Sequence, residues 1–154
     1  GTVSPGTGGR TLAQAATLAV YDLTERKIVW NEEIIPGLKQ YTEMLRLSDG
    51  RILIAGERDR LAVFNPETRK IEKITPLAGF GSLVLQQGSR TMYPNNGRVL
   101  LILDAGIAEY GIADARLRQL LKFPKGITAT GGGALIEGRL YFSARSRLYS
   151  YPVK

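Results

Sequence analysis

The sequence contains no cysteine and no histidine. Without cysteine the chain can form no disulfide bond, no thiolate-ligated zinc or iron–sulfur site and no thiol nucleophile. Without histidine it lacks the usual general base and the commonest metal ligand, and it cannot hold a Ser-His-Asp triad. A metal site could use only carboxylate, hydroxyl and carbonyl oxygens, which favour calcium over zinc. We therefore expect no cofactor and favour a chain that is not catalytic by itself.

Long hydrophobic runs are also missing. The longest strongly apolar run, Val99–Leu103, is far too short to span a bilayer, and the first twenty residues lack the basic start and apolar stretch of a signal peptide. With 154 residues, 44% hydrophobic and 23% charged, the composition is typical of one globular domain. An exported and a cytosolic protein both fit a cysteine-free chain. The compartment stays open, with a bacterial periplasmic or extracellular location favoured over a cytoplasmic one.

The sequence does contain an internal repeat. Four segments resemble one another at intervals of roughly 41 to 46 residues: TLAVYDLTERKIVW from Thr17, RLAVFNPETRKIEKI from Arg60, GIAEYGIADARLRQLLKF from Gly106 and RLYSYPVK from Arg147. A second set precedes three of them and places a Gly-Arg turn before an apolar run: SDGRILIAGE from Ser48, NNGRVLLILD from Asn95 and IEGRLYFSAR from Ile136. Each unit therefore predicts a series of antiparallel strands joined by turns.

Four strands at this period are typical of a β-propeller blade. YDLTERKIVW resembles the Asp-x-x-Thr-Gly-Lys-x-x-Trp segment of quinoprotein blades, and DGRILIAGERDRLAVFNPETRKI resembles kelch-type and lactonase-type blades. The chain departs from each family: Arg26 or Arg69 replaces the quinoprotein glycine, the kelch double glycine is missing, and the Gly-His and Trp-Asp pairs of WD40 repeats are absent. The resemblance implies the propeller architecture and no particular family.

The predicted fold is thus all-β, a β-propeller of about three and a half four-stranded antiparallel blades, or half a ring. We place a half-blade at 1–34, blades at 41–75 and 82–123, and a last incomplete blade at 128–154. The expected first strands of the last two blades are 82–93, which is irregular, and 128–136. Because each blade buries its faces against neighbours, the remaining blades would come from a second chain, a second copy or a parent protein. A compact β-sandwich is the alternative.

The net charge of +7 is expected to gather on the loops of one propeller face. A one-sided basic face attracts an anionic partner, and arginine suits bidentate recognition of carboxylate, sulfate or phosphate. A solvated rim of ordinary surface charges is the simpler alternative. The predicted anion-binding residues are Arg58, Arg60, Arg145, Arg147, Arg90, Lys39, Lys125 and Arg10.

These observations predict a non-catalytic propeller segment that binds an acidic saccharide or a protein partner through its basic face. Specific nucleic-acid binding is not expected, because few aromatic residues lie among the basic ones and no known motif is present. The alternative is part of a propeller enzyme, of the lactonase, lyase or quinoprotein type, whose catalytic residues lie largely in missing blades. A purely structural role is a third hypothesis.

Three weaker patterns have structural explanations. The glycines of Gly6–Gly9 lack the Gly-Lys-Ser/Thr ending of a phosphate loop. The run Thr130–Ala134 (TGGGA) suits a place where backbone approaches backbone closely. The carboxylate pairs Glu32–Glu33 and Glu57/Asp59 could act in acid–base chemistry or bind calcium, yet neither shows the spacing of a ligand loop. We also expect Trp30 and the repeated tyrosines Tyr21, Tyr110, Tyr149 and Tyr151 to pack between blades.

Overall fold

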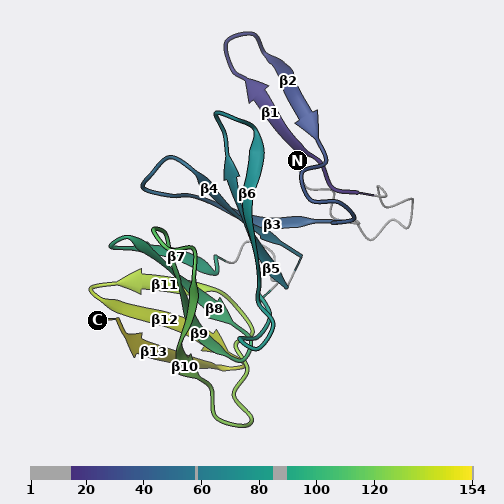
Figure 1. The fold of residues 1–154 in the computed structure, drawn as a ribbon. Helices are drawn as coiled ribbons and strands as arrows, with labels where there is room; N and C mark the ends of the chain where they lie inside the picture. Colours follow the sequence, from purple (N-terminus) through teal and green to yellow (C-terminus); the bar gives the residue numbers. More distant parts are fainter. Residues whose placement is uncertain (1–14, 58, 85–89, 154) are drawn as a thin grey trace.

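The computed structural model describes residues 15–57, 59–84 and 90–153, and all secondary structure in these residues is β. Thirteen strands are found there, in four antiparallel sheets, and this part of the chain holds no helix long and apolar enough to cross a membrane. Strands that follow one another along the chain are neighbours in each sheet, as Figure 1 shows. The prediction of an all-β fold is confirmed.

The four sheets follow the order of the repeat. The first sheet consists of β1 (Leu18–Asp22) and β2 (Lys27–Glu32). The second sheet consists of β3 (Tyr41–Arg46), β4 (Ile52–Gly56), β5 (Arg60–Asn65) and β6 (Lys70–Pro76). The third sheet consists of β7 (Met92–Asn95), β8 (Arg98–Leu103), β9 (Gly106–Gly111) and β10 (Leu117–Lys122). The fourth sheet consists of β11 (Gly133–Ile136), β12 (Arg139–Ala144) and β13 (Arg147–Pro152).

Two predicted strands are shorter than expected. Within the described residues of the predicted strand 82–93, which are 82–84 and 90–93, the regular strand begins at Met92, and an isolated bridge joins Leu83 to Leu103. The predicted strand 128–136 begins only at Gly133. Before that point the backbone bonds elsewhere, since the N–H of Ala129 donates to Asp104 and that of Thr130 donates to Ser143. These bonds hold the entering chain against the turn after β8 in the third sheet and against β12 in the fourth sheet.

The sheets are stacked face to face in chain order because their middle strands are apolar on both faces. In β4, Leu53 and Ala55 belong to the cluster shared with the third sheet, whereas Ile54 belongs to the cluster shared with the first. Side chains alternate between the two faces of a strand, so a run of consecutive apolar residues supplies both. A third cluster joins the third and fourth sheets, with Leu100, Ile102 and other residues.

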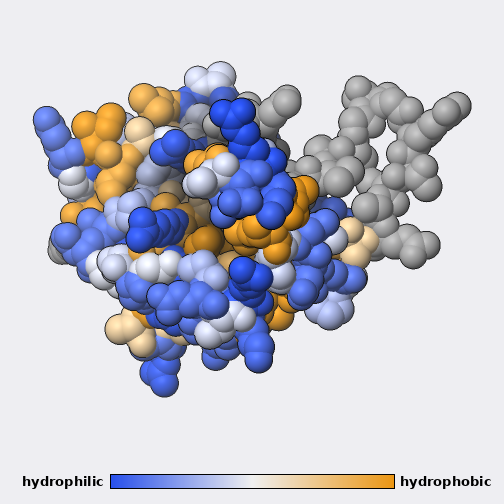
Figure 2. All heavy atoms as spheres, turned by 90° about the horizontal axis from the view of Figure 1, so that it is seen from above, coloured by the Kyte–Doolittle hydropathy of each residue, from blue (hydrophilic) through white to orange (hydrophobic). Residues whose placement is uncertain are grey.

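The two end sheets, by contrast, keep apolar side chains at the surface. Among the residues that the structure describes, eight large hydrophobic side chains are exposed, and six of them belong to the first sheet, its turn and the fourth sheet. Figure 2 shows apolar patches of this kind among hydrophilic atoms on one side of the molecule. The stack therefore has two covered middle sheets and two partly uncovered end sheets.

A polar side chain also ties each sheet to the next near the first strands. The Tyr41 hydroxyl donates to the carbonyl of Ala16 at 3.3 Å, next to the first sheet. Glu43 on β3 joins the second and third sheets, because its carboxylate accepts from the N–H and hydroxyl of Thr91 at 2.8 and 2.7 Å and from the N–H of Met92 at 3.2 Å. On β7, the Tyr93 hydroxyl accepts the N–H of Gly133 at 2.8 Å and so joins the third and fourth sheets.

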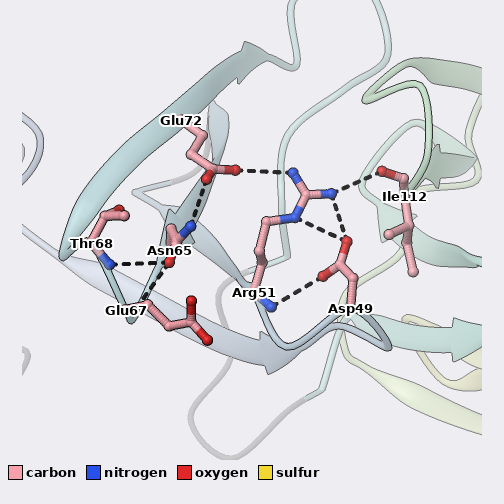
Figure 3. A network of polar contacts seen from close by, with 7 residues as sticks. All are labelled: Asp49, Arg51, Asn65, Glu67, Thr68, Glu72 and Ile112. Atoms are coloured by element: carbon pink, nitrogen blue, oxygen red, sulfur yellow. Dashed lines mark hydrogen bonds and ion pairs between the residues drawn. The ribbon is translucent and has the colours of Figure 1, made fainter.

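Arg51 forms a further link between the second and third sheets (Figure 3). Its guanidinium donates to Asp49 at 2.6 and 2.9 Å, to Glu72 at 3.1 Å and to the carbonyl of Ile112 at 3.2 Å. Glu72 also accepts a hydrogen bond from Asn65 at 2.8 Å. These hydrogen bonds hold the pKa of the Asp49 carboxyl below its usual value, mainly through Arg51, and that of Glu72 likewise, mainly through Asn65 and then Arg51.

The Arg51 network predicts a loss of stability in acid. Both carboxyls have a lower pKa in the folded chain than in the unfolded chain, so their contribution is complete above the ordinary values and disappears as the pH falls through the folded values. The free energy of unfolding should begin to fall near pH 4.5, the ordinary value of Glu72, and continue to fall below 3.8, that of Asp49. Urea midpoints measured from pH 7 to pH 2.5 would check this.

Arg51→Gln should flatten the acid dependence without removing it, because Asn65 still donates to Glu72. Arg46→Gln is the control, since Arg46 is an exposed arginine of β3. An acid profile that is the same in wild type and Arg51→Gln would contradict the prediction.

Candidate anion-binding site

A cavity of about 420 Å³ lies beside the fourth sheet. One wall comes from the segment 125–128, which leads from β10 to β11, and the other comes from the turn between β12 and β13 and the start of β13. Three of its lining residues carry positive charge and none carries negative charge. The lining residues are Lys125, Gly126, Ile127, Thr128, Ala144, Arg145, Ser146, Arg147 and Tyr149.

The tight turn between β12 and β13 places two of these cations side by side. Ala144 pairs with Arg147 at the end of the ladder, so only Arg145 and Ser146 form the connection. Arg145 has a φ of 54°, in the left-handed region that tight turns use. Its N–H donates to the hydroxyl of Thr130 at 2.9 Å, which fixes the turn against the entering chain. Both arginine side chains are exposed on the cavity wall.

In the second and third sheets, the turn that follows the corresponding strand begins with an acid. By strand register, Arg145 corresponds to Glu57 after β4 and to Asp104 after β8. The Glu57 carboxylate accepts the N–H of Lys39 at 3.0 Å, and the Asp104 carboxylate accepts the N–H of Ser82 at 2.8 Å. In the fourth sheet the contact is instead the hydrogen bond from the N–H of Arg145 to the hydroxyl of Thr130, and an arginine occupies the position of the acid. The change replaces a negative side chain with a positive one at the mouth of the cavity.

The cavity wall also has an aromatic and apolar part. Tyr149 stacks on Phe142 with ring centroids 5.6 Å apart, and Phe142 stacks on Phe123 at 4.9 Å. This column of three rings fixes the position of Tyr149, while Ile127 and Ala144 add aliphatic surface to the lining. The hydroxyl groups of Thr128, Ser146 and Tyr149 supply neutral hydrogen-bonding groups among them.

Of the eight predicted anion-binding residues, the structure brings Lys125, Arg145 and Arg147 together. Within the described residues, no ion pair involves these three side chains. Three positive groups thus face one cavity without a balancing carboxylate in its lining.

The other predicted residues lie elsewhere. Arg60 pairs with Asp59 at 2.7 Å, which balances its charge and lowers the pKa of the Asp59 carboxyl. Lys39 and Arg90 are exposed and do not line the cavity. Arg10 and Arg58 lie outside the described residues, as do the glycines of the SPGTGGR segment.

The sequence predicted the charged half of this site and missed the neutral half. Thr128, Ser146 and Tyr149 are all within three residues of a predicted cation, and that proximity was the available signal. The carboxylate pairs show structural roles: Glu33 accepts the N–H of Gly37 at 2.7 Å, and Glu57 accepts that of Lys39. In the part of the chain that the structure describes, no group of three or more acidic side chains could hold a metal ion.

Comparison with solved structures gives matches of the fold. No family model and no curated protein matches the chain. A solved structure described as the extracellular domain of a one-component system from B. thetaiotaomicron is similar, with a TM-score of 0.60 and 18% sequence identity. The match covers 89% of this chain and 19% of that one, so the chain spans about a fifth of its structural neighbour. At this identity the similarity is one of fold alone.

Proposed function

We propose that this chain is a β-propeller segment that binds an acidic saccharide in the cavity formed by Lys125, Arg145 and Arg147. The propeller assignment is supported by meander sheets that recur at the period of the sequence repeat and stack on one another. The ligand assignment depends on one observation above all: Arg145 occupies a turn position that is acidic in the two preceding sheets.

The electrostatics of the cavity favour an anion. Both arginines carry positive charge, and arginine can donate two parallel hydrogen bonds to a carboxylate or a sulfate. Lys125 adds a third positive charge from the opposite wall. Because these side chains are exposed, binding should weaken as salt screens the attraction.

The rest of the lining favours a saccharide over a small inorganic anion. A volume of about 420 Å³ exceeds what one sulfate or phosphate needs, and it falls in the usual range for small-molecule sites, about 300–1,000 Å³. An aromatic ring such as Tyr149 offers an apolar face to the C–H groups of a sugar, while its hydroxyl and those of Thr128 and Ser146 can bond to sugar hydroxyls. The combination fits a uronic acid or a sulfated sugar.

Titration calorimetry with digalacturonate, using neutral digalactose as the matched sugar, tests the proposal. Digalacturonate should bind and digalactose should not. The double variant Arg145→Ala/Arg147→Ala should weaken digalacturonate binding by roughly a hundredfold, because each lost charge-assisted bond is worth about 1.5–3 kcal/mol and exposure reduces that value. Lys39→Ala/Arg90→Ala, which removes two exposed charges away from the cavity, should bind like wild type.

Equal binding of the two disaccharides, or unchanged binding by the cavity variant, would reject the saccharide proposal. Binding of a protein partner to the basic face stays a prediction. So does the alternative that the chain is part of a propeller enzyme whose catalytic residues lie largely in other blades. Cleavage of the digalacturonate during the titration would favour the enzyme hypothesis.

A further inference from the structure

The repeat places an aromatic residue at the same position of four strands, and only one of the four is left uncovered. By register, these residues are Tyr21 on β1, Phe64 on β5, Tyr110 on β9 and Tyr151 on β13. Phe64 packs on the first sheet and Tyr110 on the second, and each is only 1% exposed. Tyr151 packs on the third sheet. Each of these three aromatic residues therefore faces the preceding sheet. Tyr21, before which the described residues form no sheet, is 52% exposed.

The residue two positions after the aromatic one shows the same difference in exposure between the third sheet and the first. Ile112 follows Tyr110 and is buried against the second sheet, with 9% exposure. Its counterpart after Tyr21 is Leu23, which is 85% exposed. We call Tyr21 and Leu23 the back face of the first sheet. It is an apolar surface of the kind that the stack buries elsewhere.

The opposite end of the stack shows the complementary surface. Leu61 on β5 and Ile107 on β9 face the following sheet and are completely buried. Their counterpart on β13 is Leu148, which is 73% exposed. It shares its face of the fourth sheet with Tyr141 and Ile136, as the strand pairing shows. We call Ile136, Tyr141 and Leu148 the front face of the fourth sheet.

Every sheet interface in the stack has the same direction: the front face of one sheet is covered by the back face of the next. The two uncovered surfaces are thus the two halves of this same interface, and a single chain carries both. We propose that the chain associates head to tail with a second copy, whose back face covers the front face of the fourth sheet.

Arg139 supplies a polar contact for the proposed interface. It is the arginine of the Gly-Arg turn that leads into β12, as Arg51 is the arginine of the turn that leads into β4. Arg51 reaches across to the next sheet and donates to the carbonyl of Ile112 at 3.2 Å. By the same register, Arg139 would donate to the carbonyl of Leu23 in the second copy. In the single chain its guanidinium donates to the hydroxyl of Ser150 at 2.8 Å.

Light scattering on the full chain at increasing concentration tests the proposal. Head-to-tail contacts form a ring where the rotation closes and a longer series where it does not, so a mass at or above twice 16.9 kDa supports the proposal. Tyr21→Asp and Leu148→Asp should each return the chain to the monomer mass. Ile74→Asp, on an exposed apolar residue of the second sheet, should not. At a protein concentration where the wild type is itself monomeric, all three variants should keep its thermal midpoint, because the replaced side chains are exposed in the single chain.

A mixture of the two face variants provides the sharpest test. An equimolar mixture of Tyr21→Asp and Leu148→Asp contains one intact back face and one intact front face, so it should form a dimer joined by a single interface. If instead each face bound the identical face of another copy, mixing the two variants would not restore association. A monomeric wild type, unchanged association of either variant, or a mixture that stays monomeric would each overturn the proposal. None of these outcomes depends on the saccharide site.

Discussion

Gly133→Ala should unfold the fourth sheet and abolish ligand binding at the cavity beside it. Gly133 begins β11 and pairs with Phe142 on β12. A methyl group at this position would overlap the carbonyl oxygen of Tyr141, which belongs to the backbone and cannot rotate away. The strands would have to separate, which removes their ladder hydrogen bonds and exposes the apolar cluster beneath. We expect a loss of at least about 3 kcal/mol in the free energy of unfolding, at the upper end of overpacking effects.

Urea denaturation would measure this loss, with Gly97→Ala as the control. Gly97 lies in the turn between β7 and β8, and no atom beyond its own chain neighbours stands within 4 Å of the site where its methyl group would be placed. Its φ of 77° makes alanine strained there by about 1–2 kcal/mol. If Gly133→Ala were no more harmful than Gly97→Ala, the overlap would have been relieved by backbone movement, contrary to the prediction.

Glu43→Ala should destabilise the contact between the second and third sheets by about 3–5 kcal/mol, because it removes three hydrogen bonds to a charged acceptor. Thr91 and Met92, which supply the donors, are buried at 3% and 2% exposure, so two backbone N–H groups would lose their partners away from water. The same urea measurement applies. The apolar contacts between the sheets would persist, so the chain should keep its strands while losing stability.

Two further variants separate the hydrogen bonds from the charge. Glu43→Gln keeps one carbonyl acceptor and should lose roughly half as much stability as Glu43→Ala. Glu32→Ala, which removes an exposed carboxylate from β2, should change stability by less than about 0.5 kcal/mol. Similar losses for Glu43→Ala and Glu32→Ala would show that the carboxylate of Glu43 is not a tie between sheets.

The sequence predicted the strands well because turn chemistry and alternation are local properties. Gly-Arg turns such as those before Ile52 and Val99 mark where a strand begins, and β9 and β10 both lie in the repeat segment that starts at Gly106. The predicted strand 128–136 was too long, because the backbone before Gly133 bonds to Asp104 and Ser143, which are distant in the chain. The alternation of apolar and polar residues within one segment contains no information about such contacts between distant residues.

The candidate site was predicted only in part, for a related reason. Charge on loops could be read from the sequence, but whether a cation is balanced depends on its neighbours. Arg60 has Asp59 beside it, whereas Arg145 and Arg147 meet Lys125 across a cavity. Comparing the turns position by position would have shown that Arg145 replaces an acid. The role of Glu43 could not be found this way, since its partners are 48 and 49 residues away in the chain.

The stacking of sheets in chain order also bears on how the molecule assembles and opens. Each sheet joins strands that are adjacent in sequence and packs only on its neighbours, so folding can spread from sheet to sheet as in other linear repeat arrays. The second and third sheets are covered on both faces, so we expect them to be the most stable part of this array. In the single chain, the hairpin of β1 and β2 and the edge strand β13 have one face in solvent and should fray first, with amide protons that exchange sooner. The cavity lies in this later-forming, earlier-opening part of the molecule, where a bound ligand would slow the exchange.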